Sequence, residues 1–142
     1  MPWQVFDHTA DLGLRVEAPT RAALFEEAGR ALTSLFVESP DATVRARERI
    51  EFALTAAEPA DLLFDWLHAL LVAFEVRHLL LARFAVELDE GADGLRLRAS
   101  AWGEGVDRSR HRLAREVKAI TYHGLFRRPE GDGWAAEVIV DV

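Results

Sequence analysis

Hydrophobic and polar positions alternate with two different periods along the chain, and each change of period marks an expected element. Residues 3–6 and 12–18 follow a period of two, which predicts two short strands. The segment between them, residues 7–11, is polar and turn-like. From Thr20, apolar residues recur at helical spacing as far as Phe36, which predicts a helix with Thr20 as its N-cap. The chain therefore opens with two strands and an amphipathic helix.

The middle of the chain continues with a strand and a second helix. Residues 44–55 return to a period of two, with apolar side chains on one face and charged ones on the other, which is typical of a half-buried strand. Pro59 then begins a helix whose wide apolar stripe reaches Phe74. A stripe of that width predicts packing against both a sheet and the first helix.

The last part of the chain has the pattern of antiparallel β-structure. Four strands are predicted, at residues 80–88, 95–102, 116–126 and 134–142. Glycine-rich segments between the first two and between the last two predict hairpins, and residues 103–112 form a long polar connection. The order ββαβαββββ, with helices segregated against an antiparallel sheet, predicts one α+β domain over residues 1–142.

Composition narrows the class of protein. Half of the residues are hydrophobic and 29% are charged, as in an ordinary globular domain, and the absence of cysteine excludes disulfides and thiolate metal sites. The start of the chain lacks the pattern of a signal peptide, and no apolar run is long enough to span a membrane, so we expect a cytoplasmic protein. The net charge of −7 argues against direct binding of nucleic acid, although arginines cluster at residues 108–115, and favours a protein partner.

Most catalytic signatures are missing from the sequence. It has no phosphate-binding Gly-Lys-Ser/Thr loop, no dinucleotide fingerprint, no Gly-x-Ser-x-Gly elbow and no His-Glu-x-x-His pair among its five histidines. A conventional hydrolase or transferase would have to be built from carboxylates.

Carboxylates gather at two places that the pattern singles out. Asp11 closes the polar segment before the second strand, and Asp141 lies beside Val142 in the final strand, where the Val142 carboxylate is a second anion. Adjacent anions repel each other unless a cation joins them, and hard cations such as Ca²⁺ or Mg²⁺ favour oxygen ligands. The alternative is that Asp141 is a solvated residue on an exposed face.

Lys118 is the only lysine among 17 basic residues, and the other sixteen are arginines. It lies in the segment Glu-Val-Lys-Ala-Ile-Thr-Tyr-His. One interpretation is an ordinary strand with a surface Lys–Glu pair, which contributes little to stability. The other is a cation placed to hold an anion, either a carboxylate of the site or a phosphate of a partner.

Four segments resemble the archease family: FDHTADLGLRV, LRLRASAWGE, EVKAITYHG and EVIVDV, in that order over essentially the whole chain. The resemblance implies a compact α+β fold with two helices packed against antiparallel sheet. It also implies a metal site at Asp11, Asp141 and Val142, for Ca²⁺ or for Mg²⁺ or Mn²⁺, and a functional lysine at Lys118. We expect Lys118, His8 and Asp7 to contact the partner or an anion. Asp7 departs from the glutamate that the family commonly has there.

The resemblance further implies an activator of an RtcB-type RNA ligase, which joins RNA ends in tRNA splicing and RNA repair. Archeases promote guanylylation of the ligase histidine, restore multiple turnover and broaden the accepted nucleoside triphosphates. We therefore expect an accessory protein and not an enzyme. Two alternatives are a stand-alone metal-dependent phosphohydrolase that uses the same carboxylates, and a chaperone or scaffold for RNA-modifying enzymes. An assay of phosphoester cleavage by the purified protein tests for the phosphohydrolase. A chaperone or scaffold would bind many partners, and its binding would not depend on the carboxylates.

Overall fold

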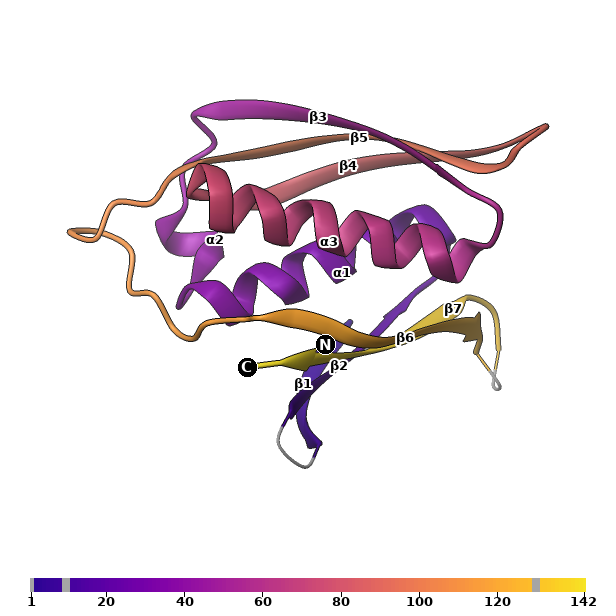
Figure 1. Cartoon of the computed structure of the whole chain (residues 1–142), viewed down its shortest axis with the longest axis horizontal. Helices are drawn as coiled ribbons and strands as arrows, with labels where there is room; N and C mark the ends of the chain where they lie inside the picture. The colour runs from indigo at the N-terminus through magenta and orange to yellow at the C-terminus, as the bar shows by residue number, and fades with distance from the viewer. Residues whose placement is uncertain (1, 9–10, 129–130) are drawn as a thin grey trace.

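Two long helices lie between two antiparallel sheets, so the chain forms three layers (Figure 1). The computed structural model describes residues 2–8, 11–128 and 131–142, with the main chain alone for Asp7, His8, Tyr122, His123, Phe126 and Arg127. The elements are β1 (Trp3–His8), β2 (Asp11–Ala18), α1 (Arg21–Phe36), α2 (Pro40–Thr43), β3 (Glu48–Ala56), α3 (Pro59–Arg77), β4 (Leu79–Gly91), β5 (Gly94–Gly105), β6 (Ala119–Arg127) and β7 (Trp134–Asp141).

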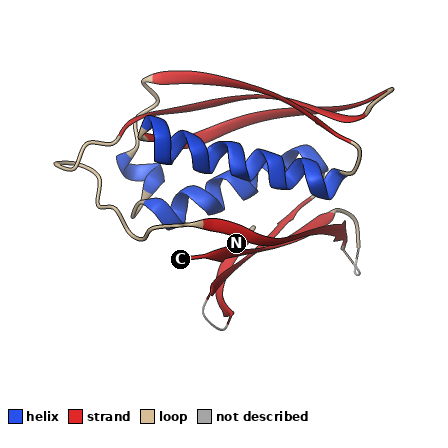
Figure 2. Cartoon of the chain, viewed as in Figure 1, coloured by secondary structure: helices blue, strands red, loops and turns tan. Residues whose placement is uncertain are grey.

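The two sheets divide the chain unevenly. One sheet has four strands in the order β1-β2-β7-β6, and the other has three in the order β3-β5-β4. The three-stranded sheet comes from the middle of the chain, whereas the four-stranded sheet joins its first strands to its last ones (Figure 1). Figure 2 shows the two groups of strands on opposite sides of the helices. The pairing of β2 with β7 therefore brings residues that are far apart in the sequence to one edge of the molecule.

Each helix contacts both sheets, because its buried stripe is wide. Helix α1 packs against β2 and β4, and α3 packs against β3 and β6. Thr20 caps α1 through its hydroxyl oxygen, which accepts the Ala23 N–H at 3.1 Å. Trp66 of α3 is fully buried, and its indole N–H donates to the Phe25 carbonyl of α1 at 2.9 Å. This bond satisfies the one polar atom that the buried indole brings into the core.

The α+β class, the two long helices and the order of the predicted strands are confirmed by the structure. The structure adds the short helix α2 and divides the strands into two sheets. Among the described residues, no helix has both the length and the apolar character needed to cross a membrane.

Two predicted strand starts are wrong. Strand β3 begins at Glu48 instead of residue 44, because Arg45 donates its backbone N–H to the Glu104 side chain at 2.8 Å and not to a neighbouring strand. Strand β6 begins at Ala119 instead of residue 116. The residues before it form part of a loop, and Ala114 donates its N–H to the Phe36 carbonyl at the end of α1 at 2.8 Å. Alternation alone does not distinguish a strand from an extended segment that finds other partners.

Candidate functional site: a pair of aspartates across two strands

Asp11 and Asp141 are directly opposite each other in the antiparallel pair formed by β2 and β7. Residues that are opposite in such a pair share a face of the sheet, with Cβ atoms about 4.5–5.5 Å apart. On both strands the alternate residues, such as Leu14 and Val138, are buried against the helices. The two aspartates therefore lie on the outer face of the four-stranded sheet, where both are half-buried.

The same two strands carry a second charged pair on that face, and it is neutralised. Arg15 and Glu137 are opposite each other, and the Arg15 Nη1 lies 3.0 Å from the Glu137 Oε2. For Asp11 and Asp141, no cationic side chain that the structure describes lies within the 4.0 Å of an ion pair. Like charges directly opposite each other destabilise a sheet. The aspartate pair is therefore a place where a bound cation would stabilise the fold.

Lys118 joins this edge through its main chain. Its backbone N–H donates to the Asp141 carbonyl at 2.8 Å, and the next residue, Ala119, is the β6 partner of Asp141. The Lys118 side chain is exposed, and it lines a groove beside the ends of α1 and α3. No carboxylate among the described side chains forms an ion pair with it. The structure thus places Lys118 beside Asp141 in the backbone, with its charge available to a partner.

The two remaining predicted contact residues are only partly described. His8 of β1 is the backbone partner of Asp11, and Asp7 is the partner of Leu12. Their side chains lie outside the described part of the structure. Backbone register therefore brings His8, Asp11 and Asp141 into one row, to which Val142 is adjacent in sequence.

The chemistry of this row fits a hard divalent cation. Two carboxylates on one face supply anionic oxygen ligands, which Ca²⁺ and Mg²⁺ prefer to nitrogen or sulfur. Among the described side chains, no group of three His, Cys, Asp or Glu residues could hold a metal ion. A cation here would therefore need further oxygens, and the main chain of Val142 is the neighbouring source. Metal binding at Asp11, Asp141 and Val142 stays a prediction.

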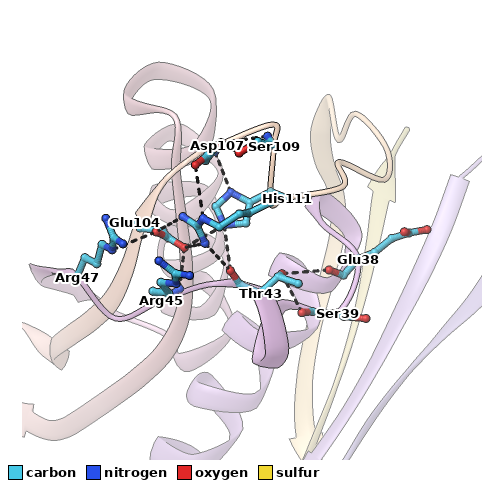
Figure 3. A network of polar contacts seen from close by, with 10 residues as sticks. Glu38, Ser39, Thr43, Arg45, Arg47, Glu104, Asp107, Ser109 and His111 are labelled. Carbon is cyan, nitrogen blue, oxygen red and sulfur yellow. Dashed lines mark hydrogen bonds and ion pairs between the residues drawn. The ribbon is translucent and has the colours of Figure 1, made fainter.

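A second polar cluster lies at the end of β5 and was not predicted. The carboxylate of Glu104 is almost completely buried and accepts two bonds from the Arg110 guanidinium, at 2.6 and 3.0 Å. It also accepts the Arg45 N–H, and its Oε2 lies 3.0 Å from the His111 Nε2 (Figure 3). The bond from Arg110 is the main reason that the pKa of Glu104 falls from 4.5 to about 2.

The protonation of His111 follows from its neighbours. Its Nδ1 faces the backbone N–H of Asp107 at 2.8 Å, and an N–H can only donate, so Nδ1 carries no proton. The proton is on Nε2, which lies 3.1 Å from the Thr43 carbonyl and 3.0 Å from Glu104. In the described part of the chain, every buried side-chain nitrogen and oxygen has a hydrogen-bond partner. The cluster is therefore closed on itself, and its role is to hold the loop after β5 in place.

In the structure, the arginines of residues 108–115 have different roles. Arg110 binds Glu104 internally, and Arg112 lies 3.6 Å from Glu38 on the surface. Sequence reasoning treated the arginines at residues 108–115 as one basic group. The available signal was the glutamate six residues before Arg110, between Gly103 and Gly105, but spacing in an irregular loop does not predict contact.

Comparison with known proteins agrees with the fold and with the motifs. The model of the Archease protein family matches residues 3–142. The archease of Methanopyrus kandleri is 37% identical over 142 residues, which cover 100% of both chains. That of Pyrococcus abyssi is 32% identical over 141 residues, with 99% of this chain and 98% of the relative covered. The solution structure of Methanobacterium thermoautotrophicum protein 1598 superposes with a TM-score of 0.84 at 30% identity and covers 99% of each chain. With the motifs, the three-layer fold and these full-length matches in agreement, the chain belongs to the archease family.

Proposed function

We propose that this protein activates an RtcB-type RNA ligase of tRNA splicing and RNA repair. The activator acts by promoting guanylylation of the ligase histidine, which allows the ligase to turn over many times. The observation that carries this proposal is the facing pair Asp11 and Asp141 on a sheet surface, with the backbone of Lys118 bonded to Asp141. Membership in the archease family supports the ligase as the partner, which is what the motif resemblance implies.

The aspartate pair and Lys118 have complementary roles in this proposal. Asp11, Asp141 and the main chain of Val142 would hold a divalent cation, which would supply positive charge for the phosphate oxygens of the nucleotide. Lys118 is an exposed cation on the adjoining segment, where it binds an anionic group of the ligase or of its nucleotide. Guanylyl transfer depends on positioning and on charge neutralisation, both of which an accessory protein can supply. The histidine nucleophile belongs to the ligase, so this chain needs no nucleophile of its own.

The proposal is tested by ligase turnover with and without this protein. Purified cognate ligase is given GTP and an RNA with ligatable ends, and the ligated product and the guanylylated fraction of the ligase are followed over time. We expect product to stop near one equivalent of ligase without this protein, and to continue past it with this protein. An unchanged product yield and guanylylated fraction at stoichiometric protein would contradict the proposal. Cleavage of phosphoesters by this protein alone, with Mg²⁺ or Mn²⁺, would favour a phosphohydrolase instead.

A further inference from the structure

A groove of about 1350 Å³ opens between the end of α3 and the loop of residues 106–118 that follows β5. The loop crosses the ends of α1 and α3 before it enters β6 (Figure 1). The lining includes the apolar side chains of Phe74, Val106 and Leu113. The Phe74 ring is half-buried and stacks on the buried Phe36 ring at a centroid distance of 4.3 Å. The groove thus has a firm apolar floor that reaches the surface.

Cations line the loop side of this groove. Arg108, Arg115 and Lys118 are all exposed. Their charges form no ion pair with any carboxylate whose side chain the structure describes, in contrast to Arg110 and Arg112 of the same loop. Aromatic residues and arginines that surround an apolar centre are typical of protein interfaces.

Several contacts tie the loop to the rest of the protein. The buried Glu104 cluster anchors Arg110 and His111, and Val37 and Leu113 form a β-bridge beside it. The Arg115 N–H donates to the Leu35 carbonyl of α1 at 3.2 Å. A loop held in one conformation loses little conformational entropy on binding, which favours affinity.

The charges of the groove favour a protein over RNA. Glu75 on α3 and Glu116 beside Arg115 also line it, while the charge of Asp107 is shared with Arg110 at 3.4 Å. An RNA backbone carries a negative charge at every nucleotide and would meet these carboxylates and a chain of net charge −7. A protein segment can place its carboxylates opposite the arginines and away from Glu75 and Glu116. It can also place an apolar side chain on the floor of the groove.

We propose that this groove docks the ligase, by receiving an acidic surface segment with an apolar side chain for the floor around Phe74. The inference rests on the proposed function, and it separates two tasks. The groove holds the partner through Arg108 and Arg115, whereas Asp11 and Asp141 act on the chemistry. Lys118 borders the groove and is the last residue of the loop before β6. It therefore connects the docking surface to the aspartate row.

The test compares two charge-reversal variants of equal net charge. One changes the groove, Arg108→Glu with Arg115→Glu. The matched control changes two exposed arginines on the outer face of the sheet β3-β5-β4, Arg83→Glu with Arg98→Glu. Calorimetry measures the affinity for purified ligase, and turnover measures the protein concentration for half-maximal activation. We expect the groove variant to lower the affinity for the ligase by about tenfold or more and to raise the protein concentration for half-maximal activation by the same factor, with unchanged turnover at saturation. The control should change both quantities little.

The outcomes separate this inference from the proposed function. Equal affinity of wild type and groove variant overturns the docking surface, even where wild type activates. Equal weakening by both variants also overturns it, because long-range charge then explains the effect. If wild type binds the ligase without activating it, and the groove variant loses that binding, the docking surface is supported and the proposed function is contradicted. Failure of wild type to bind the ligase overturns the surface as well.

Two further measurements complete the test. Circular dichroism checks the fold of each variant, and Arg108→Gln with Arg115→Gln replaces the groove variant if the charge reversal does not fold. Fluorescence anisotropy with a labelled RNA oligonucleotide examines the other class of partner. RNA binding that depends on Arg108 and Arg115, with ligase affinity unaffected by them, would overturn the inference in favour of RNA.

Discussion

Glu104 and Arg110 form a two-point ion pair, with their oxygens and nitrogens 2.6 and 3.0 Å apart, across six positions of sequence. The carboxylate is at the end of β5 and the guanidinium in the middle of the loop, so this pair determines where the loop runs. The carboxylate is buried and also accepts bonds from His111 and the Arg45 N–H, so removing it takes an acceptor away from each of these donors.

This pair predicts a specific loss of stability in acid. The pKa of Glu104 is lowered from 4.5 to about 2, so the ionised carboxylate favours the folded chain above a pH of 4.5. That contribution declines as the pH falls from 4.5 to about 2, where the folded chain also takes up the proton. Glu104→Gln should lower the free energy of unfolding at neutral pH by about 1–3 kcal/mol and flatten its pH dependence in this window. Chemical denaturation at several pH values measures both effects.

The control for this prediction is Glu87→Gln, because Glu87 is exposed on the three-stranded sheet. It should leave both the stability at neutral pH and the acid slope close to those of wild type. A wild-type slope in the Glu104 variant would show that other carboxyl groups cause the acid sensitivity.

The aspartate pair predicts opposite effects of one substitution with and without metal. Without divalent cations, Asp11→Asn or Asp141→Asn should raise stability by about 0.2–1 kcal/mol, because it removes a like-charge repulsion. With millimolar Ca²⁺ or Mn²⁺, wild type should gain stability and the variants should gain less. Thermal unfolding in chelator and in each metal measures the difference.

Glu137→Gln is the matched comparison, since Glu137 lies on the same strand and face and is bonded to Arg15. It should lose a little stability in both conditions and respond to metal like wild type. A metal response of the aspartate variants equal to that of wild type would remove Asp11 and Asp141 from the proposed site.

Lys118→Ala should preserve the fold and reduce ligase activation by about tenfold or more, because it removes one charge-assisted contact with the partner. Its structural contact is the backbone N–H bond to the Asp141 carbonyl, which alanine retains. Multiple-turnover ligation at fixed protein concentration is the measurement. Arg45→Ala is the control, since Arg45 also makes its described polar contact through the backbone, to Glu104. Wild-type activation by the Lys118 variant would show that the ammonium is not needed.

The proposed ligand at Val142 predicts sensitivity to an extension of the chain. In a protein produced as residues 1–142, a short Gly-Ser segment added after Val142 converts the terminal carboxylate into a neutral amide carbonyl. The cation site would lose one anionic ligand, and ligand charge tunes affinity strongly, so binding of Ca²⁺ should weaken by about tenfold or more. Calorimetry on this form and on one extended at the other end of the chain makes the comparison. Equal affinity of the two forms would reduce the site to its aspartates.

Local patterns predicted the elements of this fold better than the contacts between them. Helix α1 was predicted through its apolar spacing and the Thr20 cap, because both signals lie within a few neighbouring residues. The pairing of Asp11 with Asp141 depends on register between strands separated by most of the chain, and a shift of one residue would turn one aspartate to the other face. The motif resemblance, and not the alternation, assigns the two aspartates to one metal site. In the structure they are opposite each other, and the metal site itself stays a prediction.

The parts that were missed have nonlocal partners. Residues 44–47 have the alternation of a strand, but the Arg45 N–H is taken by a side chain that lies 59 positions away. The burial of Glu104 was unpredictable for a related reason, since a charged residue is expected at the surface unless its partners are known. Arg110 and His111 supply those partners from an irregular loop, where no period indicates which side chains face each other.

The pairing of β2 with β7 has a consequence for synthesis of the protein on the ribosome. The sheet β3-β5-β4 is complete in sequence once residue 105 has left the exit tunnel, but β2 must wait for residues 134–141 to gain its second neighbour. Until then, β2 lacks its second neighbour and the face of α3 that packs against β6 remains uncovered in the nascent chain, which exposes both to chaperones and to aggregation. The aspartate row forms only with β7, so a translation product truncated before residue 134 cannot bring Asp11 and Asp141 together.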